Sequence, residues 1–186
     1  MEDTLIVELY WARDEAAIKH SKDKYGNYCY KIAYNILSNN EDSEECVNDT
    51  WVGAWNSMPP NRPSFLGAFL GKITRNISLK RWRDAHAKKR GGDETALVLE
   101  ELEECLPSGK SVEEEVDARQ LTGHIEGFIK TLSASEQKVF IRRYYYLEKI
   151  PEVALRTGFS ESKVKSMLFR LRGRLKLYLE REGYDI

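Results

Sequence analysis

One segment near the carboxyl end, IPEVALRTGFSESKVKSMLFRLRGRLK over residues 150–176, constrains the fold of this chain more than any other. Ala154 allows two helices to cross closely, Gly158 permits the positive φ of a tight turn, and Ser160 can cap the following helix. Val164 then stands where a side chain fills the angle between the two helices. This register predicts a helix-turn-helix, whose second helix enters the major groove of DNA.

The second helix of this segment carries an apolar stripe and a basic surface. The stripe runs from Val164 to Tyr178 at spacings of three and four, and it predicts the buried side. An isolated basic helix is more often a bundle helix with a solvated face, but here the register of Ala154, Gly158, Ser160 and Val164 favours DNA. The early residues are expected to reach base edges and the later arginines to meet phosphate. The predicted duplex contacts are Ser162, Lys163, Lys165, Ser166, Arg170, Arg172 and Arg174.

The rest of the chain also indicates helices. Apolar residues recur at three and four with no convincing alternating strand, so the chain is predicted to be nearly all α. Its 186 residues can hold one ordinary domain or two small ones, and 41% hydrophobic content suffices for compact helical cores. Ser133 and Glu136 have the spacing of a capping box at the start of another helix.

Charge is distributed in blocks that the net value of −1 hides. Lys72–Arg90 has eight bases against one acid, and Ser160–Arg181 has seven bases against two acids. Between them, Gly91–Arg119 has ten acids against two bases, and this composition predicts a solvated, mostly disordered tether. The pattern therefore indicates two basic-ended helical units joined by an acidic flexible linker.

The N-terminal basic unit contains an acidic helix followed by an aromatic and basic one. In EDSEECVNDTWVGAW the acids predict a solvent side and Cys46, Val47, Thr50, Trp51 and Ala54 predict a core side. On the later helix Phe65, Phe69, Ile73 and Ile77 are expected to face inward. Trp82 lies among bases, an arrangement that suits single-stranded nucleic acid because bases stack on rings while cations follow the backbone.

No feature of the sequence indicates an enzyme, a metal site or a cofactor. There is no glycine-rich phosphate loop, no ligand cluster and no plausible catalytic triad. Cys29, Cys46 and Cys105 are widely spaced and odd in number, which favours free, partly buried thiols. The acidic start has too short an apolar stretch for a signal peptide, and no apolar run could cross a membrane, so we expect a cytoplasmic protein.

Three motif blocks carry a resemblance to a known family. They are NNEDSEECVNDTWVGAW, FLGAFLGKITRNISLKRWR, and LSASEQKVF with PEVALRTGFSESKVKSMLFRLRGRLK. In this order they resemble the extracytoplasmic-function group of bacterial sigma-70-type RNA polymerase sigma factors, from about Ala17 to Leu179. The resemblance implies an all-α fold with a region 2 bundle over 1–90, an acidic linker over 91–118 and a region 4 helix-turn-helix over 119–186.

The resemblance also implies a subunit that does no covalent chemistry. Its region 2 would dock on the clamp helices of the largest polymerase subunit through Asp42, Glu45, Asn48 and Asp49. The loop matching Ser57 to Ser64 and the helix after it would capture and melt the minus-ten element, while region 4 would read the minus thirty-five duplex. The minus-ten residues so implied are Arg62, Lys72, Arg75, Asn76, Lys80, Arg81, Trp82 and Arg83.

The partners implied by the resemblance are core polymerase, including its flap, promoter DNA, and an anti-sigma factor that is often membrane-anchored. The linker would thread the active-site cleft and the RNA exit path of the polymerase. Two departures are mild: Asn48 stands where the family usually has glutamine, and Phe69 where it often has tryptophan. No sensory domain is expected after region 4.

Two other functions remain open from the residues alone. A helix-turn-helix regulator acting without polymerase would explain residues 131–180 but would leave the acidic helix and the aromatic-basic helix without a role. A membrane-surface or scaffold protein is less favoured, because the apolar stripe of the basic helix over 161–180 is committed to a bundle.

Overall fold

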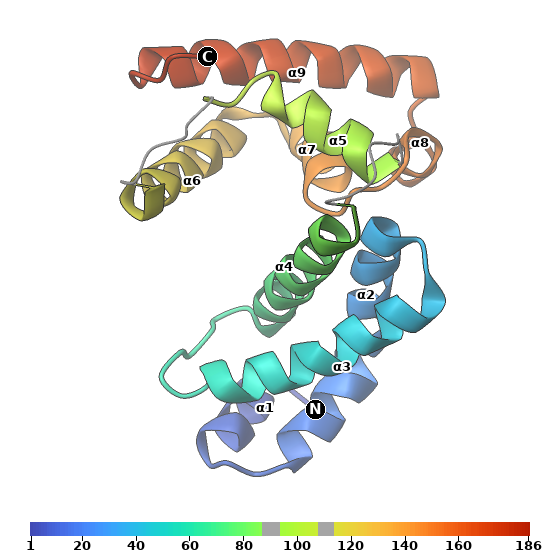
Figure 1. The fold of residues 1–186 in the computed structure, drawn as a ribbon, viewed down its shortest axis with the longest axis vertical. Coiled ribbons are helices and arrows are strands. Elements are labelled where there is room, and N and C mark those ends of the chain that lie inside the picture. The colour runs from blue at the N-terminus through green and yellow to red at the C-terminus, as the bar shows by residue number, and fades with distance from the viewer. Residues whose placement is uncertain (87–93, 108–113) are drawn as a thin grey trace. The chain divides into compact units, whose positions relative to one another are not determined.

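The structure, a computed structural model, describes residues 1–86, 94–107 and 114–186 (Figure 1). Within these residues all regular structure is helical, from α1 to α9, with no strand. The predicted all-α class is therefore confirmed. The chain divides into two compact units, Met1–Arg90 and Gly91–Ile186, each with its own buried residues.

The described part of the N-terminal unit is a helical bundle. Its elements are α1 (Asp3–Trp11), α2 (Ala16–Leu37), α3 (Asn40–Ser57) and α4 (Leu66–His86). α2 packs along both α3 and α4, which also pack against each other, and α1 lies against α2. The Asn39 side chain caps α3 by accepting a hydrogen bond from the backbone N–H of Asp42.

The core side predicted for α3 is confirmed. Its members Cys46, Val47, Thr50, Trp51 and Ala54 are all buried. The Thr50 hydroxyl lies 3.0 Å from that of Thr74 on α4, so a polar contact joins the two helices inside the apolar core.

Phe65 does not lie in this core. The expected inward position is wrong, because 78% of its surface is exposed, whereas Phe69, Ile73 and Ile77 pack against the core as expected. α4 begins at Leu66, so Phe65 precedes the helix whose four-residue spacing assigned it to the inner face.

The C-terminal unit contains the predicted helix-turn-helix. Its elements are α5 (Glu94–Glu103), α6 (Glu114–Thr131), α7 (Ala134–Tyr144), α8 (Ile150–Thr157) and α9 (Glu161–Arg181). α7, α8 and α9 pack against one another, and α6 packs against α9. The predicted capping box at the start of α7 is present.

The turn between α8 and α9 has the predicted geometry. Gly158 ends α8 at φ 72°, and Ser160 caps α9 by accepting a hydrogen bond from the backbone N–H of Lys163. Ala154 and Val164 are buried, and the stripe of α9 continues through Leu168, Leu171 and Leu175. The sequence predicts each of these positions because each depends on residues only a few places away.

The acidic linker is not a solvated tether where the structure describes it. Residues Glu94–Glu103 form α5, which packs on α7, and Val98 and Cys105 are buried. The apolar residues inside the acidic run supply a buried side, and two of its acids, Glu94 and Glu101, pair with arginines of the bundle. The predicted boundary at 90/91 and the basic residues 88–90 lie outside the described residues.

Two further expectations concern cysteines and membranes. Cys29, Cys46 and Cys105 are free and buried, and burial raises the pKa of each thiol, to about 11 for Cys105. Among the described helices, none combines the length and the apolar character that a bilayer crossing requires.

Candidate functional site

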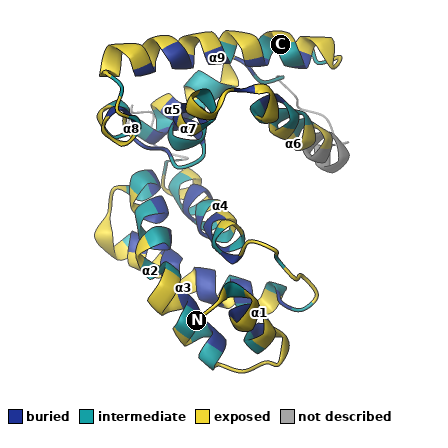
Figure 2. Ribbon diagram, turned by 180° about the vertical axis from the view of Figure 1, so that it is seen from behind, coloured by how far each residue is buried: buried dark blue, intermediate teal, exposed yellow. Residues whose placement is uncertain are grey.

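The first turns of α9 present polar and basic side chains to solvent. Figure 2 shows buried and exposed residues alternating along this helix. Because Val164, Met167 and Leu168 face the core, the opposite side of the same turns is open. The predicted base-reading residues Ser162, Lys163, Lys165 and Ser166 are all exposed on it.

Two phenylalanines that are not among the predicted duplex contacts, Phe159 and Phe169, lie beside these residues. The ammonium nitrogen of Lys163 lies 3.9 Å from the ring centroid of Phe159. Phe169 is 72% exposed, although it is one of the most apolar residues of α9. Its position one turn beyond Lys165 places a ring where it could meet a thymine methyl group in a major groove. The spacing of the buried stripe could have identified it as an outward residue.

The three arginines predicted to meet phosphate have different environments. Arg170 is exposed. Arg174 pairs with Glu136 of α7 at 2.6 Å but keeps 46% of its side chain exposed. Arg172 keeps only 20% exposed and turns toward α5 and α7. Of the three, Arg172 therefore has the most covered side chain.

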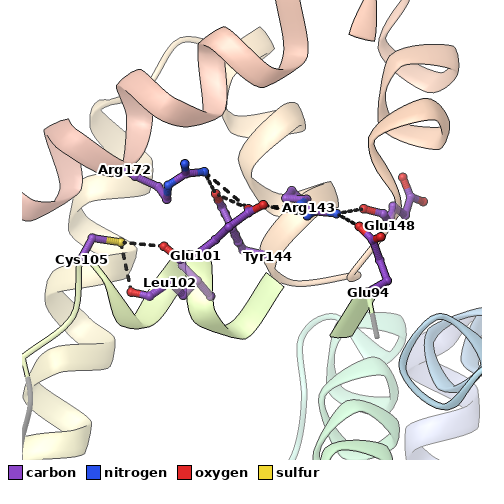
Figure 3. A network of polar contacts seen from close by, with 8 residues as sticks. All are labelled: Glu94, Glu101, Leu102, Cys105, Arg143, Tyr144, Glu148 and Arg172. Carbon is purple, nitrogen blue, oxygen red and sulfur yellow. Dashed lines mark hydrogen bonds and ion pairs between the residues drawn. The ribbon is translucent and has the colours of Figure 1, made fainter. Parts of the chain in front are cut away.

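Arg172 belongs to a network of charged and polar groups (Figure 3). Its guanidinium donates a hydrogen bond to the Tyr144 hydroxyl at 2.9 Å and lies 3.4 Å from the Glu101 carboxylate. The Tyr144 hydroxyl in turn donates to Glu101 at 3.1 Å. Burial raises the pKa of Tyr144, so the hydroxyl stays protonated and makes both contacts.

The same network holds a buried cation. Arg143 of α7 is 2% exposed, and its guanidinium pairs with Glu101 at 2.9 Å and with Glu94 at 2.5 Å. It also donates to the backbone carbonyl of Glu148 at 3.2 Å. Both carboxylates come from α5, so the acidic linker neutralises the one arginine of α7 that lies inside the unit's core.

The second candidate surface lies along α4. Lys72, Asn76 and Lys80 are exposed and recur every four residues, and Arg83 continues the same side of the helix. Arg75 and Trp82 are half-buried. The Trp82 ring stacks on His86 with ring centroids 4.7 Å apart. Lys72, Lys80 and Arg83 thus share one exposed surface of α4 with Asn76.

Arg81 lies differently from the other bases of α4. Its guanidinium pairs with Glu45 at 2.6 Å and with Asp42 at 3.1 Å, both on α3. Hydrogen bonding to Arg81 holds the pKa of Glu45 below its usual value. The structure thus joins a residue expected to bind DNA to two residues expected to bind polymerase.

The predicted docking residues share the outer side of α3. Glu45, Asn48 and Asp49 are exposed, and Asp42 is half-buried. Their spacings of three and four place them on one side of the helix, opposite the core residues. An acidic helix surface of this kind suits a basic partner surface.

The loop before α4 is tied to α1. Arg62 forms an ion pair with Glu8, and its guanidinium carbon lies 4.5 Å from the ring centroid of Trp11. The Trp11 indole N–H donates to the backbone carbonyl of Asn61 at 3.1 Å. These contacts hold the loop, and Phe65 stands exposed where it ends. Sequence reasoning missed Phe65 as a candidate because it assigned the ring to the core.

The described residues offer no metal site, since no cluster of histidine, cysteine or acidic side chains has the arrangement of a ligand set. The three cysteines are free and buried. The arrangement can bind and orient charged partners through its exposed bases and acids.

Comparison with known proteins identifies both units. A family model for sigma-70 region 2 matches residues 23–88, and one for sigma-70 region 4 matches residues 125–175. Among curated proteins none matches this sequence. A solved structure of CnrH in complex with the cytosolic domain of CnrY is 19% identical, with 96% of this chain and 97% of that chain covered. Its TM-score is 0.39, which supports no inference.

Proposed function

We propose, from the premise that this chain belongs to the sigma-70 family of RNA polymerase sigma factors, that its two units make two separate promoter contacts on behalf of core polymerase. The chain is a sigma factor of the extracytoplasmic-function group, with a region 2 and a region 4 in that order. The observation that carries the proposal is that each matched region has an exposed basic helix surface, on α4 and on α9.

The C-terminal unit is proposed to read the minus thirty-five element as duplex. Ser162, Lys163, Lys165 and Ser166 of α9 would reach base edges, with Phe169 beside them, while Arg170 and Arg174 would meet phosphate. The exposure of the early turns of α9 supports this assignment. Arg172 would join the phosphate contacts only after leaving its partners in the unit.

The N-terminal unit is proposed to open the minus-ten element. The bases along α4, with Asn76 and Trp82, would follow the separated strand, and Arg62 would hold the loop against α1. Phe65 would stack on an unpaired base, because a mostly exposed ring at the end of a restrained loop offers a free aromatic surface.

Polymerase binding is proposed for the outer side of α3, through Asp42, Glu45, Asn48 and Asp49. No enzymatic step is needed for any of these roles. The proposed partners are core polymerase, with its clamp helices and flap, and promoter DNA, and we place the protein in the cytoplasm with them. An anti-sigma factor is a further proposed partner, by family resemblance.

A regulator that binds duplex DNA without polymerase is the second candidate. The exposed early turns of α9 would serve it equally well. It would give no role to the acidic side of α3 or to the region 2 match. Initiation from a promoter template by core polymerase plus this protein distinguishes the two functions, and duplex binding without any initiation would favour the regulator.

Replacing Phe65 by alanine should reduce promoter opening by about tenfold, since loss of one base–aromatic stack is worth about 1–3 kcal/mol. Permanganate reactivity of unpaired thymines, measured with core polymerase present, reports the opening. Phe65→Trp should retain most of it. Leu5→Ala removes another exposed apolar side chain, 54% exposed on α1, and serves as the matched control. Equal opening by Phe65→Ala and Leu5→Ala would remove Phe65 from the proposed contacts.

A further inference from the structure

The acidic helix α5 is bound to the helix-turn-helix unit through one carboxylate that serves two arginines. Glu101 pairs with Arg143 at 2.9 Å and reaches Arg172 at 3.4 Å, and the Tyr144 hydroxyl connects them (Figure 3). Arg143 is buried beneath α5, while Arg172 stands on α9 itself. The linker therefore reaches the helix that is proposed to read DNA.

Arg172 stands on the same flank of α9 as two other bases. Lys165 lies two turns before it and Lys176 one turn after it, so the three share one side of the helix. Lys165 is exposed, whereas Arg172 is partly covered and Lys176 is half-buried. The flank is thus a row of cations whose middle member is held by the linker.

We propose that Glu101 occupies a phosphate site formed by Arg172 and the Tyr144 hydroxyl, so that α5 and the DNA backbone compete for the same flank of α9. This inference rests on the proposed function of α9. A carboxylate and a backbone phosphate are both anions that a guanidinium binds through directed N–H groups, so one can replace the other.

Because α5 is acidic, α5 and the DNA backbone cannot occupy this flank of α9 at the same time. The stretch from Glu94 to Glu104 carries acids and no base, so a phosphate backbone drawn to Lys165 and Arg172 would be repelled by α5 while it stays bound. Release of α5 would open Arg143 to water as well, so this cation would lose its two carboxylate partners without being left buried. Release therefore differs from mutation of the acids, which would leave Arg143 covered and unpaired.

Replacing Glu101 by glutamine tests the competition in the full chain. The variant should bind a minus thirty-five duplex about threefold more tightly, with the salt slope steeper by about 1, because one more phosphate contact forms. The gain should vanish when Arg172→Ala is also present. Glu103→Gln removes an exposed acid of the same helix and is the matched control. The inference would be overturned if Glu101→Gln gave the same gain in affinity when combined with Arg172→Ala. It would also be overturned if Glu103→Gln alone gave that gain.

A second readout needs no substitution. Cys105 follows α5, is 2% exposed, and its thiol donates to the backbone carbonyl of Leu102 at 3.1 Å. If DNA displaces α5, Cys105 should become open to alkylation, whereas Cys29 and Cys46 in the other unit stay protected. Peptide-resolved alkylation of the wild-type chain, with and without the duplex, measures this directly. It remains informative if Glu101→Gln fails to fold.

The outcomes separate this inference from the proposed function. Absence of duplex binding by the wild-type protein, alone and with core polymerase, contradicts the function itself. Duplex binding with Cys105 still protected, and with the wild-type salt slope in Glu101→Gln, leaves the function standing and contradicts the competition. Duplex binding with Cys105 exposed and an Arg172-dependent gain supports both.

Discussion

Replacing Arg143 by alanine is expected to destabilise the C-terminal unit by about 3 kcal/mol, since removing one partner of a buried ion pair strongly destabilises a fold. The guanidinium is almost fully buried, and its two carboxylate partners keep about a third of their side chains exposed, 32% for Glu94 and 28% for Glu101. Water can therefore partly compensate the acids that remain, which places the expected loss at the lower end of the range.

The tryptophans allow each unit to be followed separately. All four, Trp11, Trp51, Trp55 and Trp82, lie in the N-terminal unit. In urea unfolding of Arg143→Ala, the tryptophan fluorescence transition should stay in place while a part of the far-UV circular dichroism transition moves to lower urea.

Arg156→Ala is the matched control for this experiment. Arg156 also pairs with an acid, Glu148 at 3.2 Å, but 41% of its side chain is exposed, and Glu148 keeps Arg142 as a second partner. Its loss should therefore stay below about 1 kcal/mol. If Arg143→Ala behaved like Arg156→Ala, the ion pairs would not be what holds α5 on the bundle.

Reversing the charges of Asp42, Glu45 and Asp49 to lysine is expected to weaken core polymerase binding by about 3 kcal/mol, roughly a hundredfold in Kd. These acids share the outer side of α3, and three lysines would oppose the basic surface that such a helix suits. A titration of labelled protein with core polymerase measures the loss. Binding of the isolated minus thirty-five duplex should change little, because α9 belongs to the other unit.

The control for this variant must carry the same change in net charge. Glu2, Asp23 and Glu44 are exposed acids of the same unit outside the docking set, and their reversal provides it. Because Asp42 and Glu45 also pair with Arg81, thermal unfolding of both variants must be compared. A folded docking variant that keeps its affinity would move the polymerase surface away from α3.

The helix-turn-helix could be predicted closely because each requirement is local. A positive φ at Gly158, a cap at Ser160 and a buried stripe beginning at Val164 all depend on residues only a few positions apart. The core side of α3 was predictable for the same reason, since helical spacing alone separates Trp51 from Glu45.

The linker was harder to predict, because its composition and its spacing point in opposite directions. Ten acids indicate a solvated segment, but Thr95, Val98, Leu102 and Cys105 recur at three and four and form a buried or half-buried side. The spacing was the better signal. Glu94 and Glu101 pair with Arg143, which is distant in sequence, and no local pattern indicates that Arg143 lies inside the unit.

The inward position of Phe65 was wrong, and the partners of Arg172 inside the unit were not foreseen, for related reasons. The inward position of Phe65 depended on where α4 begins, and a shift of one residue at a helix start is beyond what spacing resolves. The assignment of Arg172 to phosphate considered α9 alone, whereas its side chain is turned by Tyr144 and Glu101 from two other helices.

The ion pairs of α5 also determine where hybrid proteins can be joined. A chimera that takes its last four helices from this chain, but everything before them from a relative, would carry Arg143 without Glu94 and Glu101. In such a hybrid the guanidinium of Arg143 would lack both of its carboxylate partners. Junctions placed before Glu94 keep both acids with their arginine, so the exchangeable module begins at α5.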